Sequence, residues 1–195
     1  MLEIFAGQPS PEVVALVGDV RLAGELNRGL LELEGLPNPR KPTVVATVGG
    51  RVEGFLQYSV YREGMSVSLA HVRLALRIAG PLRLLRSIPR LQARQRVDLE
   101  HPADTLYVAE LHVDPARRGE GIGGRLLDWA DARARTLGFR KLSLTTYSTN
   151  LARHLYERHG YVVVARRDDP GYERFTGTPG RLLMVKDLTD AANPS

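Results

Sequence analysis

The stretch RRGEGIGG, from Arg117 to Gly124, carries four glycines between the apolar run TLYVAELHV and the amphipathic run GGRLLDWADARARTLG. The first run has the composition of a strand, and the second repeats its apolar residues at helical spacing. A strand, a glycine loop and a helix in this order gather backbone N–H groups and the positive end of the helix dipole at the loop. The stretch therefore predicts an α/β architecture with an anion site where the helix begins.

Three kinds of phosphate ligand fit a glycine loop of this sort. The spacing of Gly119, Gly121 and Gly124 formally satisfies the dinucleotide fingerprint GxGxxG. That fingerprint needs an acid for the ribose roughly 20 residues later, and the absence of Asp and Glu from 132 to 156 argues against NAD. A nucleotide-hydrolysing P-loop needs Gly-Lys followed by Ser or Thr, and Gly124 is followed by Arg and Leu. The third ligand is the pyrophosphate of coenzyme A.

Residues on both sides of the loop favour coenzyme A. The stretch HVDPARRGEGIGGRLLDWA resembles the acyl-CoA-binding motif of the GNAT superfamily of N-acetyltransferases, in which Arg or Gln, then x-x-Gly-x-Gly or Ala, follows a strand that ends Val-x-Pro. Val113 and Pro115 precede the loop, and Arg118, Gly121 and Gly123 occupy the motif positions. Downstream, NLARHLYERHGY is similar to the second family motif, a helix that carries Leu-Tyr-Glu and closes with Gly-Tyr or Gly-Phe.

The resemblance covers residues 105–188 and implies both a fold and a reaction. The implied α/β fold is a mixed, mostly antiparallel central sheet of about six to seven strands flanked by helices. The implied reaction transfers acetyl from acetyl-CoA to a primary amine in a ternary complex, and the coenzyme lies where two central strands part. Residues expected at the coenzyme are Leu111, His112, Val113, Arg118, Gly119, Gly121, Ile122, Gly123, Gly124, Asn150 and Tyr156.

One position departs from the family pattern. Where the second motif commonly has Asn, this chain has Thr149, and Asn150 lies one residue nearer to Tyr156. Asn150 is therefore a candidate coenzyme contact. Its alternative role is to cap the helix, a duty that Ser148 and Thr149 are equally able to perform.

Acetyl transfer needs a proton for the departing thiolate, and the resemblance assigns this role to Tyr156. The alternative is that Tyr156 packs in the core, because it lies at helical spacing from Ala152. The oxyanion of the tetrahedral intermediate is expected to be held by a backbone N–H near Leu111 or His112, since family members have a bulge in this strand.

The base is sought in the strand before the loop. Strand alternation predicts that Val108, Glu110 and His112 share one face. A partly buried Glu110 would have a raised pKa and accept a proton from the ammonium group, and His112 is the second candidate. The alternatives are that Glu110 attracts the amine electrostatically and that His112 is structural.

An arginine-rich segment without motif content spans residues 71–97. It holds seven arginines and no acid, and its leucines and isoleucines predict two or three short helices broken at Gly80, Pro81 and Pro89. Unopposed arginines raise a second class of function, a nucleic-acid or acidic-partner binding module. No aromatic residue occurs between 62 and 106 to stack on bases, which argues against single strands. A solvated helix face, or a surface that packs on a second subunit, is the favoured interpretation.

The substrate is expected to contact the first helical region, the arginine-rich segment and a turn-rich loop over 168–180, where Asp168, Asp169 and Glu173 would attract a cationic amine. Towards the N-terminus, two β-branched or aromatic runs joined by Gly49 and Gly50 predict a hairpin.

Composition sets the remaining expectations. The 195 residues predict a single domain over 1–190 with a frayed tail at 191–195. The chain lacks cysteine, which excludes disulfides, thiolate metal sites and a cysteine acyl-enzyme, and no metal is expected. The net charge of +5 favours an anionic ligand. A cytoplasmic enzyme fits best, with no membrane partner and with the homodimer common in the family; an acyl-CoA sensor without turnover is a further alternative.

Overall fold

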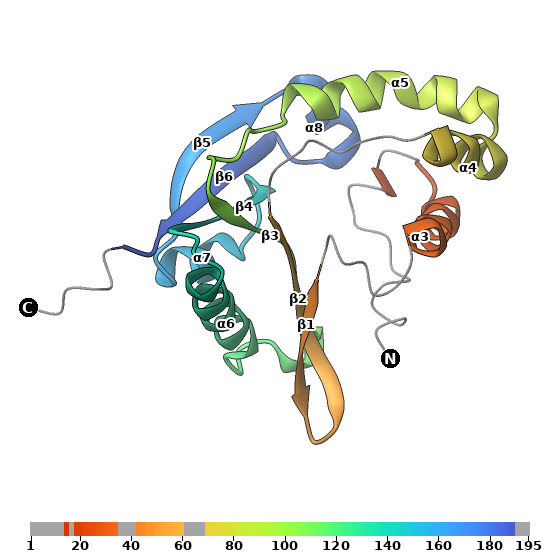
Figure 1. The fold of residues 1–195 in the computed structure, drawn as a ribbon. Coiled ribbons are helices and arrows are strands. Elements are labelled where there is room, and N and C mark those ends of the chain that lie inside the picture. The colour runs from red at the N-terminus through yellow and green to blue at the C-terminus, as the bar shows by residue number, and fades with distance from the viewer. Residues whose placement is uncertain (1–13, 16–17, 35–41, 61–68, 190–195) are drawn as a thin grey trace, which may run out of the picture. The chain divides into compact units, whose positions relative to one another are not determined.

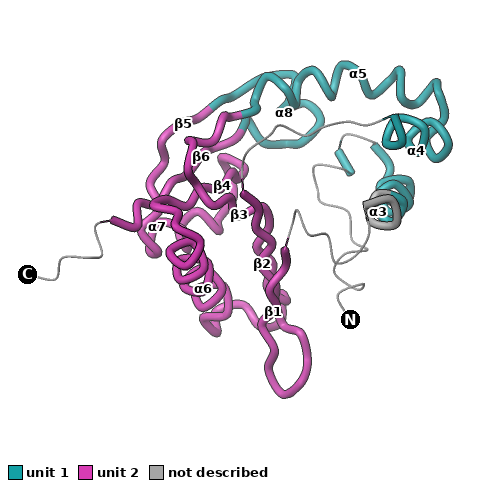
Figure 2. The backbone as a smooth tube through the Cα atoms, viewed as in Figure 1, with its two compact units in different colours: residues 1–38, 63–98, 167–180 teal, residues 39–62, 99–166, 181–195 magenta. Residues whose placement is uncertain are grey.

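The computed structural model describes residues 14–15, 18–34, 42–60 and 69–189 (Figure 1). The chain divides into two compact units (Figure 2). We call residues 1–38, 63–98 and 167–180 the helical unit, and residues 39–62, 99–166 and 181–195 the sheet unit. The tail expected at 191–195 lies outside the described residues.

The central sheet has six strands in the order β1-β2-β3-β4-β6-β5. The β3–β4 pair is parallel, whereas β1–β2, β2–β3 and β4–β6 are antiparallel. This confirms the mixed, mostly antiparallel sheet expected from the sequence. The strands are β1 (Thr43–Val48), β2 (Arg51–Val60), β3 (Thr105–Val113), β4 (Lys141–Tyr147), β5 (Val162–Asp168) and β6 (Gly180–Asp187).

The first two strands form the expected hairpin. Val48 pairs with Arg51, so the turn consists of Gly49 and Gly50 alone. Both glycines have positive φ, 57° and 80°, which suits a two-residue turn whose twist matches that of the strands. The hairpin prediction is confirmed.

A bulge in β3 changes which side chains share a face. Gln57 pairs with Glu110 and Tyr58 pairs with Val108, so Ala109 is an extra residue on β3. Val108 packs in the core before the bulge, and Leu111 packs against the same core after it. The prediction that Val108 shares the face of Glu110 and His112 is therefore wrong, because the bulge shifts the alternation by one residue.

Helices α6 (Ile122–Thr136) and α7 (Arg153–Arg158) lie on one face of the sheet (Figure 1). Leu127, Ala130 and Ala134 of α6 are fully buried in the core that they form with the strands. Leu137 is 41% exposed, because α6 ends at Thr136 and Leu137 belongs to the closing turn.

The helical unit contains α3 (Val20–Glu34), α4 (Leu69–Ala79), α5 (Pro81–Arg96) and α8 (Pro170–Thr176). The arginine-rich segment thus forms two helices separated at Gly80. The expected break at Pro89 is wrong: Pro89 lies inside α5, where it is exposed and only leaves the carbonyl of Leu85 without its helical donor. None of the described helices has the length and apolarity needed to cross a bilayer.

The loop expected over 168–180 is also corrected, because it contains α8. Asp169 accepts a hydrogen bond from the Tyr172 N–H at 2.8 Å, Pro170 occupies the first helical turn, and Gly177 ends the helix at φ 73°. These are a complete set of start and stop signals for a short helix. The helix between Asp169 and Gly177 has only about two turns, so the Gly, Pro and Asp residues that start and end it make up much of the segment. This composition favoured the prediction of a loop.

Candidate active site

The central strands β3 and β4 pair only at their beginnings. Thr105, Leu106 and Tyr107 pair in parallel with residues 141–143 of β4, and no pair follows within these two described strands. From Val108 onwards, the edge of β3 that faces β4 is therefore open. Backbone N–H and C=O groups along such an edge are available to an extended ligand that adds as a strand does.

The glycine loop follows the open part of β3. Asp114 starts a short 3-10 helix, η1 (Pro115–Arg117), by accepting a hydrogen bond from the Ala116 N–H at 2.9 Å. Gly119 and Gly121 then take left-handed backbone conformations, with φ of 88° and 76°, and Gly121 is the residue before α6. No side chain caps α6. The first N–H groups of α6 therefore point to the loop without a helical acceptor, as an anion site requires.

The last two glycines of the loop serve packing. A Cβ built on Gly123 would lie 2.9 Å from Leu155 Cδ2, and one built on Gly124 would lie 2.9 Å from His159 Nε2. Helix α7 therefore packs directly on the first turn of α6. Gly54 of β2 admits α6 from the sheet side, since its Cβ would meet Ile122 Cγ2 at 3.2 Å. The absence of these side chains fixes the start of α6 against both α7 and the sheet.

The two arginines of the loop behave differently. Arg117 forms an ion pair with Glu120 at 3.0 Å across the loop. Arg118 is exposed, and no hydrogen bond or ion pair to its side chain is found among the described residues. Its guanidinium is close enough to contribute to the lowered pKa of His112. Arg118 is thus the cation of the loop that is available to a phosphate.

The structure places Glu110 and His112 on the face of the sheet opposite α6. His112 is half-buried and stacks on Phe55, with ring centroids 5.6 Å apart. Burial lowers the pKa of His112, Arg118 lowers it further, and Asp114 opposes the shift. The imidazole is therefore neutral at neutral pH. Glu110 is exposed, so the partial burial expected for it is wrong; the bulge at Ala109 turns it to the solvent side of the strand.

Tyr156 lies in α7, in the turn that packs on the loop through Leu155. It is 8% exposed, and burial raises the pKa of its phenol. Its ring packs edge-on against Tyr161, with centroids 6.1 Å apart. Among the described residues, no protein group is hydrogen-bonded to the Tyr156 hydroxyl. The packing of the Tyr156 ring in the core is confirmed. Proton donation by its hydroxyl stays a prediction.

Asn150 is engaged by its own turn. Its amide donates to Thr146 Oγ1 at 2.7 Å, and its side-chain oxygen accepts from the Ala152 N–H at 2.9 Å. Asn150 therefore orders the turn before α7, whereas the N-cap residue of α7 is Ala152 and no side chain caps this helix. A contact from Asn150 to the coenzyme stays a prediction.

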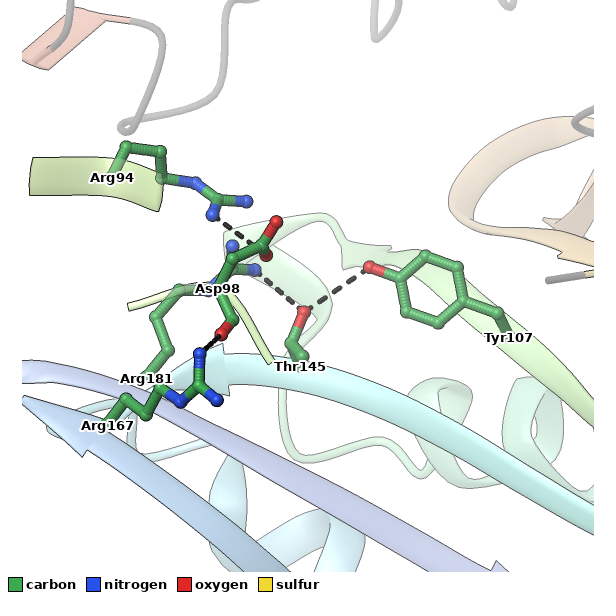
Figure 3. Close-up of polar contacts among 6 residues, drawn as sticks. All are labelled: Arg94, Asp98, Tyr107, Thr145, Arg167 and Arg181. Carbon is green, nitrogen blue, oxygen red and sulfur yellow. Dashed lines mark hydrogen bonds and ion pairs between the residues drawn. The ribbon is translucent and has the colours of Figure 1, made fainter. Parts of the chain in front are cut away.

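The face that carries Glu110 and His112 also holds a polar chain that sequence reasoning missed. Arg181 of β6 donates to Thr145 Oγ1 of β4 at 2.7 Å, and the Tyr107 hydroxyl lies 3.3 Å from the same oxygen (Figure 3). The alternation of polar residues in KLSLTTY was the available signal. It does not show which neighbouring strand supplies the arginine, so the cluster became visible only with the strand order.

The acids expected to attract the amine are partly engaged elsewhere. Asp169 forms an ion pair with Arg96 at 2.6 Å and also caps α8. Glu173 is exposed in the first turn of α8. Within the described residues, no group of three or more His, Asp or Glu side chains is arranged to hold a metal ion.

The open parallel strand pair beside the uncapped, glycine-led helix fits the coenzyme site expected from the sequence, and known proteins support that assignment. A family model described as an acetyltransferase (GNAT) domain matches residues 91–163. Aminoalkylphosphonate N-acetyltransferase of Salmonella typhimurium is 32% identical over 130 residues, which span 61% of this chain and 77% of that protein. The uncharacterized N-acetyltransferase YycN of Bacillus subtilis is 36% identical over 63 residues, 32% of this chain and 40% of the relative.

Solved structures show the same fold. A GCN5-related N-acetyltransferase from Kribbella flavida superposes with a TM-score of 0.53 at 19% identity, covering 83% of this chain and 76% of that one. The chain belongs to the GNAT superfamily, and it is an enzyme of the N-acetyltransferase class.

Proposed function

We propose that this protein transfers the acetyl group of acetyl-CoA to a primary amine, directly and within a ternary complex. The observation that carries the proposal is the parting of β3 and β4 after Tyr107, next to an α6 that begins at Gly121 without a side-chain cap. The open strand edge fits an extended pantetheine arm, and the helix start fits a pyrophosphate.

The residues that would hold acetyl-CoA are those of the loop and of the open strand. Backbone N–H groups from Ile122 to Gly124 and the Arg118 guanidinium would bind the pyrophosphate. Main-chain groups of Leu111, His112 and Val113 would pair with the pantetheine amides. Acetyl-CoA supplies an acyl thioester whose carbonyl carbon accepts the amine.

We assign the two proton transfers to Tyr156 and His112. The neutral imidazole of His112 takes a proton from the acceptor ammonium, directly or through water, and so generates the nucleophilic amine. A C–N bond then forms and the C–S bond breaks; Tyr156 gives its proton to the departing thiolate, and the attacking nitrogen loses its extra proton, which restores the Tyr156 phenol. A backbone N–H of β3 near Leu111 or His112 would stabilise the oxyanion. Exposed Glu110, on the same face as His112, would attract the cationic amine.

The acceptor class is suggested by the Salmonella relative. That protein is named for aminoalkylphosphonates, and the present chain carries a net charge of +5 with an arginine-rich helical unit. We therefore propose primary amines with a phosphonate group as the first acceptors to assay. A cytoplasmic location and a homodimer complete the proposal; the exposed apolar side chains of α5, Leu82, Leu85 and Leu91, support packing on a second copy.

The test combines binding with turnover. Calorimetric titration of the full chain with acetyl-CoA is expected to show saturable binding, and NAD serves as the negative control. Release of free coenzyme A is then followed with a thiol reagent, which reads only the product because the protein contains no cysteine. Aminomethylphosphonate and plain alkyl amines are the acceptors. Binding of NAD without acetyl-CoA would overturn the proposal, and acetyl-CoA binding without thiol release across the amines would favour a sensor.

A further inference from the structure

One face of α5 concentrates positive charge. Arg83, Arg86 and Arg90 lie at positions i, i+3 and i+7, and Ser87 lies among them at i+4. Side chains with these spacings project from the same side of a helix. Helix α5 contains no acidic residue that could offset them. The arginines therefore repel one another along the helix unless an anion or another element neutralises them.

These side chains line a pocket. The opposite wall is the turn that leads into α3, and the pocket of about 210 Å³ is lined by Gly18, Asp19, Arg83, Arg86, Ser87 and Arg90. We call it the arginine pocket. One buried water needs only roughly 10–15 Å³ of such space. The arginine pocket is therefore large enough for a phosphate-sized group together with a substituent.

Gly18 is required for the shape of the pocket. Its φ of 74° favours glycine, and a Cβ at this position would lie 2.5 Å from Arg90 Nη1. The same guanidinium nitrogen donates to the Ala15 carbonyl oxygen at 3.4 Å. Arg90 is thus anchored against the turn before α3 rather than extended into solvent.

The charges of the arginine pocket do not balance. Three guanidinium groups face one carboxylate, that of Asp19, which would oppose an anion. Asp19 already caps α3, because its Oδ1 accepts from the Leu22 N–H at 3.0 Å. Arg83 is close enough to Asp19 to contribute to the lowered pKa of that carboxyl. Among the described residues, no hydrogen bond or direct ion pair to the side chain of Arg83 or Arg86 is found. The described lining residues therefore carry more positive than negative charge, and the guanidinium groups of Arg83 and Arg86 have donors that no described residue uses.

We propose that the arginine pocket binds a phosphate or phosphonate dianion, either free or carried by a small molecule. Guanidinium forks recognise tetrahedral oxyanions through paired, charge-assisted hydrogen bonds. A concave site suits a compact dianion better than a nucleic-acid backbone, which is bound by a stripe of cations along an open surface. The lining residues share none with the loop over 117–124, so this binding does not depend on acetyl transfer.

The first test is calorimetric titration of the full chain with inorganic phosphate and with methylphosphonate, at constant ionic strength set by sodium chloride. Saturable binding of both is expected. The double variant Arg83→Gln/Arg86→Gln is expected to weaken it at least about tenfold, because it removes two charged donor groups. The matched control is Arg73→Gln/Arg77→Gln, which removes the same charge from exposed sites on α4 outside the pocket and is expected to stay within about twofold of wild type.

A second variant separates lost binding from lost folding. Ser87→Glu places a carboxylate between Arg83, Arg86 and Arg90, and is expected to raise the thermal midpoint while abolishing phosphate binding. A misfolded protein would lose both. If Ser87→Glu binds phosphate as wild type does, the proposal is wrong.

Two further arms identify the source of the dianion. Binding of aminomethylphosphonate that is tighter than that of inorganic phosphate, and that is lost in Arg83→Gln/Arg86→Gln, would show that the arginine pocket receives a dianion carried by a small molecule. Equal or weaker binding of aminomethylphosphonate would show a site for the free anion. Non-saturable heats, equal losses in both double variants, or binding of duplex DNA but not of phosphate would each overturn the proposal.

Discussion

The two units build anion sites in different ways. In the sheet unit, the glycine loop offers main-chain N–H groups at the start of α6, and Arg118 adds a side-chain cation, whereas Arg117 is paired with Glu120. In the helical unit, all the cations of the arginine pocket are side chains from α5. A backbone site needs specific residue types at fixed spacing, because left-handed turns and close helix packing admit glycine alone. A side-chain site needs only cations on one helix face.

This difference extends to the ion pairs that stabilise each unit. Lys186 donates to Asp131 inside the sheet unit, where both side chains are largely buried. Arg96 and Asp169 meet at the surface of the helical unit. Changes in the sheet unit are therefore expected to have large effects, and changes in the helical unit small ones.

The largest effect is expected from Gly121→Glu. A left-handed backbone costs a non-glycine residue about 1–2 kcal/mol, and a carboxylate at the loop opposes the pyrophosphate by several more. Acetyl-CoA binding is expected to weaken roughly a thousandfold in calorimetry. Gly50→Glu is the matched control, since its φ of 80° imposes the same strain at the hairpin tip with open space around it. Equal loss of binding in both variants would contradict a backbone site.

Tyr156→Phe comes next. Removing the proton donor is expected to lower kcat by about 10²-fold or more, with the acetyl-CoA dissociation constant nearly unchanged. Tyr161→Phe is the control in the same ring pair: its hydroxyl is buried without a hydrogen-bond partner among the described residues, so its removal is expected to leave kcat and stability intact. If Tyr156→Phe retains full kcat, the core role of Tyr156 is its only role.

The sheet unit was largely predictable from the sequence, because its signals are local. The hairpin at Gly49 and Gly50 and the β3–loop–α6 succession follow from turn chemistry and periodicity, and the mixed sheet follows from the resemblance to the GNAT superfamily. The bulge at Ala109 could not be predicted, because an extra residue in a strand can be recognised only when the pairing with the partner strand is known. That single residue decides which side chains of β3 lie on the same face of the sheet as Glu110 and His112.

The helical unit was predicted less well, because its organisation depends on contacts between distant segments. The helices α4 and α5 follow from periodicity, but Pro89 lies inside a helix, and α8 forms where a loop was expected. The arginine pocket joins residues 18–19 to α5, and no local pattern indicates that pairing. Composition shows that this unit is positively charged, but it does not show which arginines lie close together in space.

Lys186→Met tests the buried pair of the sheet unit. It leaves the Asp131 carboxylate buried, and one oxygen of that carboxylate already lacks a hydrogen-bond partner among the described residues. The free energy of unfolding is expected to fall by about 3 kcal/mol in urea denaturation. The double variant Asp131→Leu/Lys186→Met is expected to recover most of this loss, because no unpaired charge remains. A double variant no more stable than the single one would show that the pair itself supplies the stability.

His112→Gln has a smaller effect and a clear pH signature. The pKa of His112 is lowered by burial, so its neutral, proton-accepting form persists below the ordinary value of 6.5 and is lost as the pH falls through the lowered pKa. In wild type, kcat/KM is expected to fall on that acid limb. His112→Gln is expected to remove the limb and to lower kcat/KM by about 10- to 100-fold. His154→Gln, an exposed histidine of α7, should leave the profile unchanged; an acid limb that survives in His112→Gln would assign the base elsewhere.

The smallest effect is expected from Arg96→Gln, which removes the surface ion pair between Arg96 and Asp169 in the helical unit. The hydrogen bond from Arg96 is the main cause of the lowered pKa of Asp169, so the pair contributes its full stability above the ordinary value of 3.8 and loses it as the pH falls through the lowered pKa. Arg96→Gln is expected to reduce hydrogen-exchange protection of the Tyr172 N–H by only about two- to fivefold at pH 7, because Asp169 still caps α8. The difference from wild type should vanish below that lowered pKa. Arg21→Gln, whose Glu25 partner lies 4.0 Å away on exposed α3, is the control. If the loss of protection at the Tyr172 N–H corresponds to a free energy as large as that lost in Lys186→Met, side-chain contacts at the surface hold the helical unit together. The contrast between the two units would then fail.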